Sequence, residues 1–481
     1  MNNASEVVDE LKRWLNAIEG SHLQGRFKAW CFQFGIIPRL QWPFLLYDIP
    51  MSKVEAMERQ CSRFIRKWTG VPPSFSSVNL YCKDSKLTIP VSSVVEEFKA
   101  TKVRAITTLR TSKDGKVQKA GEAIKCGRKW NPQNAAAVAA EDLKQQEMIG
   151  IVCRGRQGLG NYGSQQWSKA DPKTKRDLVV LQVRRAEETT RQAKAVSLAS
   201  QGRWMAWEST TQRRLTWTEL WTMDQGKLSF ILRATADLLP TPSNLKIWGK
   251  EDDATCKLCE GRSCSLNHIL SSCPKALGEG RYRWRHDKVL GEITKWVDLE
   301  RLNDNKGESF GPNLIRFRKE GDGIRELPKK SRRSNSILAR ARDWEMQVDL
   351  TKKLVFPEAV AATSLRPDMV LLSKDTKSIL IVELTVPWEE RLDISHQLKK
   401  AKYQDLVDEA HLKGWQATQY PIEVGCRGFP GKSLRYFLQQ IGLQSLKLQK
   451  AVKAISMVAE SSSRWLWIMR GNKWSPSAGE G

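Results

Sequence analysis

The sequence has no apolar run of 18 residues, so we expect neither a membrane-spanning helix nor a membrane partner. The N-terminal stretch MNNASEVVDELKRW lacks the apolar core of a secretory signal, and the sequence contains no internal repeat of the kind that builds solenoid proteins. Acidic residues are scarce, since 53 Asp and Glu stand against 79 Lys and Arg. The chain is therefore basic, with a net charge of +26.

The positive charge occurs in every segment of the chain rather than in one tail. This distribution favours a polyanionic partner, nucleic acid before anionic membrane, over a merely soluble basic protein. Nucleic acid is therefore the expected partner, and no small-molecule substrate is expected. The chain has 481 residues, 40% of them hydrophobic, which is enough for sizeable cores in about three domains.

Cysteines are too sparse for a disulfide framework, but four of the ten fall within 18 residues, in CKLCEGRSCSLNHILSSC. Within it, Cys256, Cys259, His268 and Cys273 have the spacing of a tetrahedral zinc site. Because all four ligands come from the protein, the predicted zinc is structural rather than catalytic. Cys264 is a fifth thiol in the loop, and a set of buried free cysteines is the alternative. The spacing resembles a CCHC zinc knuckle, a module that often contacts nucleic acid.

The stretch RPDMVLLSKDTKSILIVELTVPWEE predicts two strands, Met369–Ser373 and Ser378–Val386, joined by a polar turn. A hairpin that is symmetric about this turn places Asp368 opposite Glu383, with Cβ atoms about 5 Å apart. Two carboxylates at that distance repel each other unless a cation lies between them, and Mg²⁺ or Mn²⁺ suits such oxygen ligands. A turn of odd length would shift the register by one residue and separate the pair.

Such a site is suited to phosphodiester hydrolysis, which also benefits from a positively charged side chain near the reacting phosphate. The helix that follows offers Lys399 and Lys402, and Tyr403 continues the stripe of Lys399 toward the body of the protein. In the alternative interpretation, Asp368 caps a strand, Glu383 forms a structural ion pair and the lysines are solvated. The spacing alone does not decide between the two.

The pattern also predicts how the chain is organised. The N-terminal part is mainly helical, with helix stops at Pro38 and Pro43, a capping box of Ser52 and Glu55, and then a helix as far as the turn that begins at Gly70. The expected segments are a helical region at 1–110, a basic linker at 111–200 with a long helix over 172–200, a Trp-rich helical segment at 201–250, the knuckle at 251–276, an α/β region at 277–430 with a basic loop at 307–345, and a helical region at 431–481.

The combination of these motifs is informative. Arg366-Pro367-Asp368, followed after 14 residues by Glu383, resembles the PD-(D/E)xK nuclease core in the variant that retrotransposons carry. The knuckle just upstream, LPTPSNLKIWG before it and RYRWRHDKVL after it have counterparts there. Together they resemble the C-terminal half of a non-LTR retrotransposon polyprotein of the restriction-like-endonuclease class. The stretch GRFKAWCFQFGIIPRLQWPFLLYDIPMSKVEAMER is similar to the thumb of its reverse transcriptase.

The resemblance implies a multidomain protein with a mainly α N-terminal half, a small CCHC zinc knuckle and an α/β restriction-endonuclease-like C-terminal domain. It implies metal-binding carboxylates at Asp368 and Glu383. It also implies a catalytic lysine on the next helix, because Thr385 stands where the lysine usually follows the Glu. A polar pair on the first nuclease helix corresponds to His286 and Asp287, with capping and packing as the alternative. The expected nucleic-acid contacts are Arg281, Arg283, Arg285, His286, Lys329, Lys330, Arg332 and Arg333.

The chain departs from the family in one respect. A reverse transcriptase needs an aromatic-x-Asp-Asp box, and the sole Asp-Asp pair, Asp252-Asp253, lies beside the knuckle. The resemblance therefore implies no polymerase activity. It implies a metal-dependent DNA-nicking endonuclease of the kind used in target-primed reverse transcription, located in the nucleus. A catalytically inactive DNA- or RNA-binding remnant is the alternative, and an interaction protein without a nucleic-acid role is a third possibility.

Overall fold

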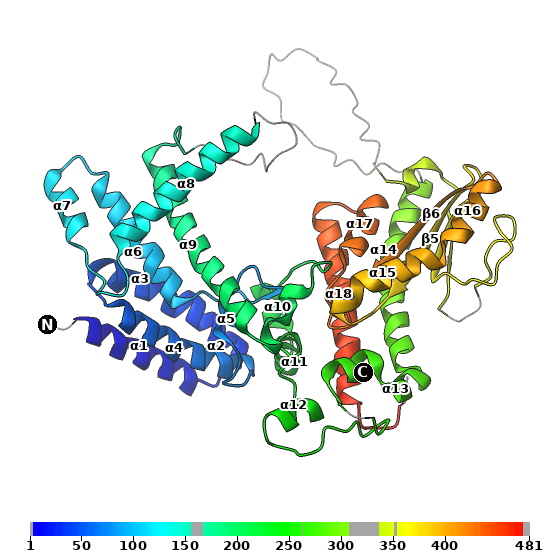
Figure 1. Cartoon of the computed structure of the whole chain (residues 1–481), viewed down its shortest axis with the longest axis horizontal. Coiled ribbons are helices and arrows are strands. Elements are labelled where there is room, and N and C mark those ends of the chain that lie inside the picture. The colour runs from blue at the N-terminus through cyan, green and yellow to red at the C-terminus, as the bar shows by residue number, and fades with distance from the viewer. Residues whose placement is uncertain (1–2, 155–166, 262, 307–335, 351–353, 475–481) are drawn as a thin grey trace, which may run out of the picture. The chain divides into compact units, whose positions relative to one another are not determined.

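The structure, a computed structural model, describes residues 3–154, 167–261, 263–306, 336–350 and 354–474. The chain divides into two compact units (Figure 1). The first comprises Met1–Met205 and Gln212–Leu238, and the second comprises Ala206–Thr211 and Leu239–Gly481. The Trp-rich segment predicted at 201–250 is thus shared between the two units.

The first unit is helical, as predicted for the N-terminal part, apart from one short parallel pair of strands. Its elements are α1 (Asn3–Gly20), α2 (Gly25–Cys31), the π-helical turn η1 (Phe32–Ile36), α3 (Ile37–Leu46), α4 (Met51–Thr69), α5 (Ser77–Tyr81), β1 (Leu87–Thr88), α6 (Val94–Arg110), α7 (Gly115–Ala123), α8 (Pro132–Arg154), α9 (Pro172–Ser197), η2 (Ser200–Ala206), β2 (Arg213–Arg214), α10 (Trp217–Thr222) and α11 (Gln225–Thr235).

The boundaries of α3 and α4 differ from the prediction. Helix α3 continues through Pro43 because Leu40 and Phe44 are buried on either side of it, so the predicted stop at Pro43 is wrong. Helix α4 begins at Met51 without a side-chain cap, so the predicted capping box is also wrong. The backbone N–H of Met51 donates instead to the carbonyl of Cys126, 3.0 Å away, which replaces a cap from Ser52. The end of α4 is as predicted, with Gly70 at a φ of 74°.

The described helices between 111 and 200 are packed rather than forming a simple connector. Helix α9 forms most of the long helix predicted at 172–200 and ends at Ser197. Together with α8 it buries an apolar cluster against α6, formed by Ala100, Val103, Ala136, Ala139, Leu143, Val179, Val180 and Val183. The helices of this region therefore belong to the core of the first unit.

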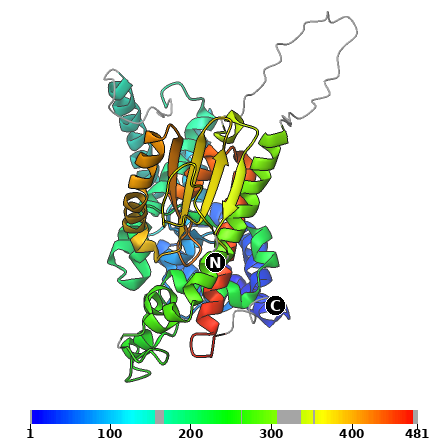
Figure 2. The same cartoon turned by 90° about the vertical axis from the view of Figure 1, so that its right-hand side faces the viewer.

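The second unit is built around a four-stranded sheet of order β3-β4-β5-β6, visible in Figure 2. Strands β3 (Glu345–Val348), β4 (Met369–Ser373) and β5 (Ser378–Thr385) are antiparallel, and β6 (Gln416–Glu423) is parallel to β5. The other elements are α12 (Pro242–Ile247), η3 (His268–Ser272), α13 (Pro274–Gly278), α14 (Arg281–Lys306), η4 (Leu338–Arg340), η5 (Glu389–Arg391), α15 (Leu392–Lys402), α16 (Gln404–Leu412), α17 (Lys432–Gln440) and α18 (Ser445–Ile468).

Helices cover both faces of this sheet. Leu380 and Val382 of β5 lie on the face that packs against α14, α17 and α18. Ile379 and Ile381 lie on the opposite face, against α16. Burial on both faces explains why β5 is an almost continuous apolar run. The helical region predicted at 431–481 is therefore part of the same core as the sheet.

A short segment before the Cys-rich loop belongs to this unit as well. Trp207 packs against Phe429, with ring centroids 5.1 Å apart. The guanidinium of Arg427 lies between the rings of Trp207 and Trp388, at 4.1 and 3.7 Å from their centroids. Glu389 neutralises this buried cation at 2.7 Å.

Among the described residues, none of the helices has both the length and the apolar composition required to cross a bilayer.

Candidate functional site

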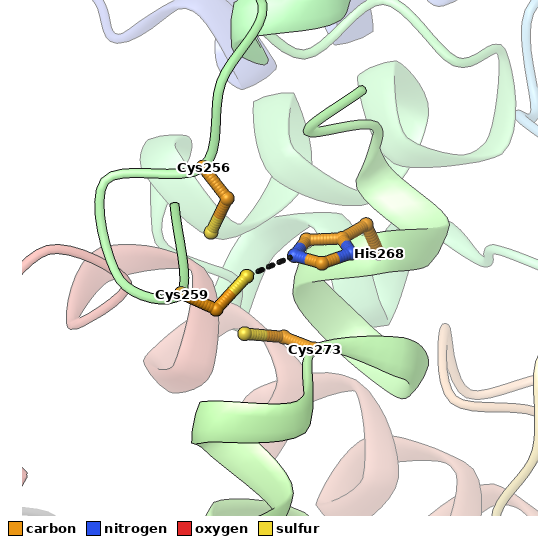
Figure 3. Close-up of side chains that lie close together, drawn as sticks. All are labelled: Cys256, Cys259, His268 and Cys273. Atoms are coloured by element: carbon orange, nitrogen blue, oxygen red, sulfur yellow. Dashed lines mark hydrogen bonds between the residues drawn. The ribbon is translucent and has the colours of Figure 1, made fainter. Parts of the chain in front are cut away.

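The Cys-rich segment forms a compact cluster of potential metal ligands. One ligand atom from each of Cys256, Cys259, His268 and Cys273 lies within 4.8 Å of all the others. Figure 3 shows the four side chains pointing toward one another, with the sulfur of Cys259 3.3 Å from Nε2 of His268. Three sulfurs and one imidazole fit a tetrahedral zinc ion, so the cluster could bind a metal such as zinc, as the spacing predicted.

Local backbone geometry explains why these side chains converge. The first two cysteines lie on a tight turn, in which Glu260 adopts a φ of 57° and its N–H donates to the carbonyl of Cys256 at 2.8 Å. His268 begins the π-helical turn η3, and Cys273 follows directly as the N-cap of α13. The hydroxyl of Tyr282 accepts a hydrogen bond from the N–H of Cys273 at 3.0 Å, which fixes the end of this turn.

The pKa shifts of Cys256 and His268 favour the ligand forms of these groups, whereas that of Cys273 does not. Burial opposes ionisation of Cys256, yet backbone N–H groups outweigh it and lower the pKa of this thiol. Burial lowers the pKa of His268, which favours the neutral imidazole that a metal requires. Burial raises the pKa of Cys273 to about 11, so a metal would have to displace its proton. Cys264 is buried but does not belong to the cluster of four.

The second candidate site is the predicted carboxylate hairpin, and its register is the predicted one. Met369 pairs with Val382, so the preceding residue, Asp368, lies opposite Glu383. The backbone N–H of Asp368 donates to Oε2 of Glu383 at 3.2 Å, and Oδ2 of Asp368 accepts from the N–H of Leu384 at 2.7 Å. The two acidic residues therefore lie side by side at one end of β4 and β5.

Side chains from the next helix reach the same carboxylate. The ammonium of Lys399 lies 2.5 Å from Oε1 of Glu383, and that of Lys402 lies 3.5 Å from the same oxygen. The hydroxyl of Tyr403 donates to Oε2 of Glu383 at 2.8 Å. Burial and the Glu383 charge raise the pKa of Tyr403, so its hydroxyl remains a hydrogen-bond donor at neutral pH. Helix α15 ends at Lys402 and α16 begins at Gln404, with Tyr403 between them at a φ of −105°.

Helix α14 also contributes to this site. Nε2 of His286 lies 3.2 Å from Oδ2 of Asp368, and Nδ1 lies 2.9 Å from Oδ1 of Asp287. Although burial opposes protonation, these two carboxylates raise the pKa of His286 to about 9. The imidazole is therefore charged at neutral pH and bridges the two acids. His286 of the predicted polar pair thus contacts the carboxylate of Asp368 directly.

The structure corrects part of the predicted nucleic-acid surface. Arg281 and Arg285 are each only 2% exposed. Arg281 donates to the carbonyls of Met469 and Asn472, and Arg285 donates to those of Leu270 and Val386. Both guanidiniums are thus used in the interior and are not available to a phosphate. Arg283 is partly exposed and lies 3.4 Å from Asp287. Lys329, Lys330, Arg332 and Arg333, with most of the predicted basic loop, lie outside the described residues.

The sequence interpretation missed a second buried acid on the same sheet. Glu423, at the end of β6, is 2% exposed and lies 3.2 Å from Nδ1 of His396. The hydroxyl of Ser433 donates to it as well. The sequence does indicate this buried acid, because Glu423 interrupts the apolar run Tyr420–Val424 just as Glu383 interrupts the apolar run of its own strand.

No protein-family model matches the chain, and no curated protein matches it. The candidate sites therefore rest on their own geometry. Among the described residues, the Cys256 cluster is the one place where three or more Cys, His, Asp or Glu ligand atoms converge.

Proposed function

We propose that the chain derives from a non-LTR retrotransposon polyprotein and acts on DNA in the nucleus as a metal-dependent nicking endonuclease. The observation that carries the proposal is the convergence of Asp368, Glu383 and Lys399 from three different elements. Two carboxylates and a lysine on one face are the components that phosphodiester hydrolysis uses. The knuckle would hold structural zinc and help to bind DNA or RNA.

The donor set of this site fits a hard divalent cation, because Asp368 and Glu383 both offer carboxylate oxygens. Mg²⁺ or Mn²⁺ held there would polarise the phosphate and lower the pKa of a bound water. Lys399 would supply positive charge beside the reacting phosphate. Tyr403 would hold the orientation of Glu383, and the His286 imidazolium would hold that of Asp368.

A second candidate function is favoured by the same contacts. Glu383 already receives two ammonium groups, a phenol and a backbone N–H. The carboxylate is therefore satisfied without a metal ion, as expected of a structural ion pair in a nucleic-acid-binding remnant.

A nicking assay separates the two. We expect the wild-type chain to nick supercoiled DNA with Mg²⁺ or Mn²⁺. Asp368→Asn keeps the size of the side chain and should lower the rate by at least about 100-fold. Asp375→Ala is the matched control, because it removes an exposed carboxylate from the turn of the same hairpin. Equal nicking by Asp368→Asn and wild type would reject the site. Salt-sensitive DNA binding without any metal-dependent nicking would establish the remnant instead.

A further inference from the structure

A groove of about 510 Å³ opens on the second unit, on the α15 side of the sheet. Its lining comes from three elements that are distant in the sequence, namely α15, β6 and α17. The buried carboxylate of Glu423 lies at its base, held by His396 of α15 and Ser433 of α17. These hydrogen bonds connect the two helices across β6 and make the groove a preformed feature of the fold.

The rim of the groove carries two unpaired cations and an open aromatic ring. Lys400 and Lys432 are exposed, and in the described part of the chain neither ammonium makes an ion pair. Tyr436, one helical turn beyond Lys432, is 56% exposed. Asp393 also lines the groove, and its carboxylate accepts a hydrogen bond from the hydroxyl of Ser209. Free ammonium groups beside an exposed ring are the features with which proteins bind single-stranded nucleic acid.

The groove is adjacent to the candidate nuclease site. Strands β5 and β6 are paired so that Thr385 lies opposite Glu423, two residues beyond Glu383. One strand spacing across and two residues along the sheet place the α-carbons of the two glutamates about 8 Å apart. On α15, His396 and Lys399 are one turn apart, and each contacts one of these glutamates. A DNA strand whose phosphodiester lies at Glu383 would therefore be close enough to extend into the groove.

We propose that this groove binds the single-stranded flank of the DNA next to the phosphodiester at Asp368 and Glu383. One base would stack on the ring of Tyr436, and the neighbouring phosphates would contact Lys400 and Lys432. The position of this flank relative to a cleaved bond rests on the proposed function, whereas the binding itself does not.

Binding is therefore measured without cleavage. In an Asp368→Asn background without added Mg²⁺ or Mn²⁺, the anisotropy of a labelled 15-nucleotide oligo-dT reports its affinity. Tyr436→Ala should weaken binding about tenfold, because a stacked base is lost. Tyr436→Phe keeps the ring and should stay within about twofold of the parent. Lys400→Ala and Lys432→Ala should each reduce the slope of log K against log salt by about 0.7. Lys450→Ala, an exposed lysine of α18 outside the groove, should leave the slope unchanged.

The outcomes separate this proposal from the nuclease proposal. Unchanged affinity in both Tyr436→Ala and Lys432→Ala would overturn the proposal that the groove binds single-stranded DNA, even if the wild-type chain nicks DNA. An equal loss of affinity for a blunt duplex would overturn the assignment to single strands. A selective loss for oligo-dT would support the groove even if no nicking is observed.

Discussion

At the scale of single residues, the central question is how a glutamate is tolerated inside the apolar strand β5. Glu383 is 5% exposed, so its charge would be costly without partners. Lys399 and Tyr403 supply them from the start and the end of one helical turn. Both interpretations of the site share this pairing, and they differ in whether Lys399 also acts on a phosphate. Substitution of the lysines addresses that difference directly.

We expect Lys399→Met to lower the nicking rate about 100-fold or more, because it removes the charge closest to Glu383. Lys402→Met should lower the rate less than about tenfold, because its ammonium is 3.5 Å rather than 2.5 Å from the carboxylate. Both variants lose one charge and keep a similar volume, so each serves as the control for the other. Single-turnover nicking at saturating Mg²⁺ measures the difference. A lower melting temperature for Lys399→Met with an unchanged nicking rate would show a purely structural pair.

A second buried acid, in the first unit, gives a prediction about pH. Glu96 of α6 lies 2.6 to 2.8 Å from Lys83, Arg184 and Arg191. Burial alone would raise its pKa, but these cations outweigh burial and lower the pKa to about 2. A depressed pKa contributes stability above the unfolded value of 4.5 that is lost as the pH falls toward 2. The contribution at neutral pH is roughly 3 kcal/mol.

Glu96→Gln should therefore lower the melting temperature at pH 7 and make it less sensitive to acid between pH 5 and about 2. Glu97→Gln is a suitable comparison, because Glu97 contacts Arg184 but not Lys83 or Arg191. Thermal unfolding at several pH values measures both variants. Parallel pH profiles for Glu96→Gln and wild type would contradict the assignment of a lowered pKa to Glu96.

At the scale of elements, the hairpin shows what local sequence could predict. Strand bounds and register followed from the polar turn at 374–377 and the apolar runs beside it. The structure confirms the register and the bounds of β4, whereas β5 ends at Thr385, one residue before the predicted Val386. The inward stripe of α15 and α16 was also predictable, because Tyr403 and Leu406 are buried at helical spacing. The break between these two helices was not, since no Gly or Pro marks it.

The arginines of α14 show where local sequence fails. The stretch RYRWRHDKVL has the composition of an exposed basic helix, yet Arg281 and Arg285 are buried. Their partners are carbonyls of residues up to 191 positions away in the sequence, such as Asn472 beyond the end of α18. Such long-range pairing leaves no periodic signal in α14 itself, so its charged side chains cannot be assigned to surface or interior from sequence alone.

The Cys-rich element carries its own prediction. Cys259→Ser should reduce bound zinc below about half an equivalent, because a hydroxyl is a poor substitute for a thiolate in a four-ligand site. Cys264→Ser is the matched control, because this thiol is buried in the same segment but lies outside the cluster. Elemental analysis of the purified variants measures the metal. Equal zinc loss in both would show that Cys264 belongs to the ligand set.

At the scale of the whole molecule, the decisive property is the charge of +26. A protein that neutralises six to ten phosphates loses about 10³- to 10⁵-fold in affinity between 50 and 200 mM salt. A chain with this excess of basic residues should fall in that range for duplex DNA. A flat salt dependence would instead favour an interaction protein without a nucleic-acid role.

Substitutions in the basic run at 329–333 test which part of the positive charge contributes to DNA binding. Replacement of Lys329, Lys330, Arg332 and Arg333 by Gln should reduce the slope of log K against log salt by up to about 3.6, because each phosphate contact contributes about 0.9. Replacement of four exposed lysines elsewhere in the chain, Lys12, Lys113, Lys413 and Lys450, removes the same charge and is the control. Filter binding to one duplex at several salt concentrations measures both. If the two sets reduce the slope equally, net charge alone drives binding; a larger effect of the 329–333 set identifies this run as a specific phosphate contact.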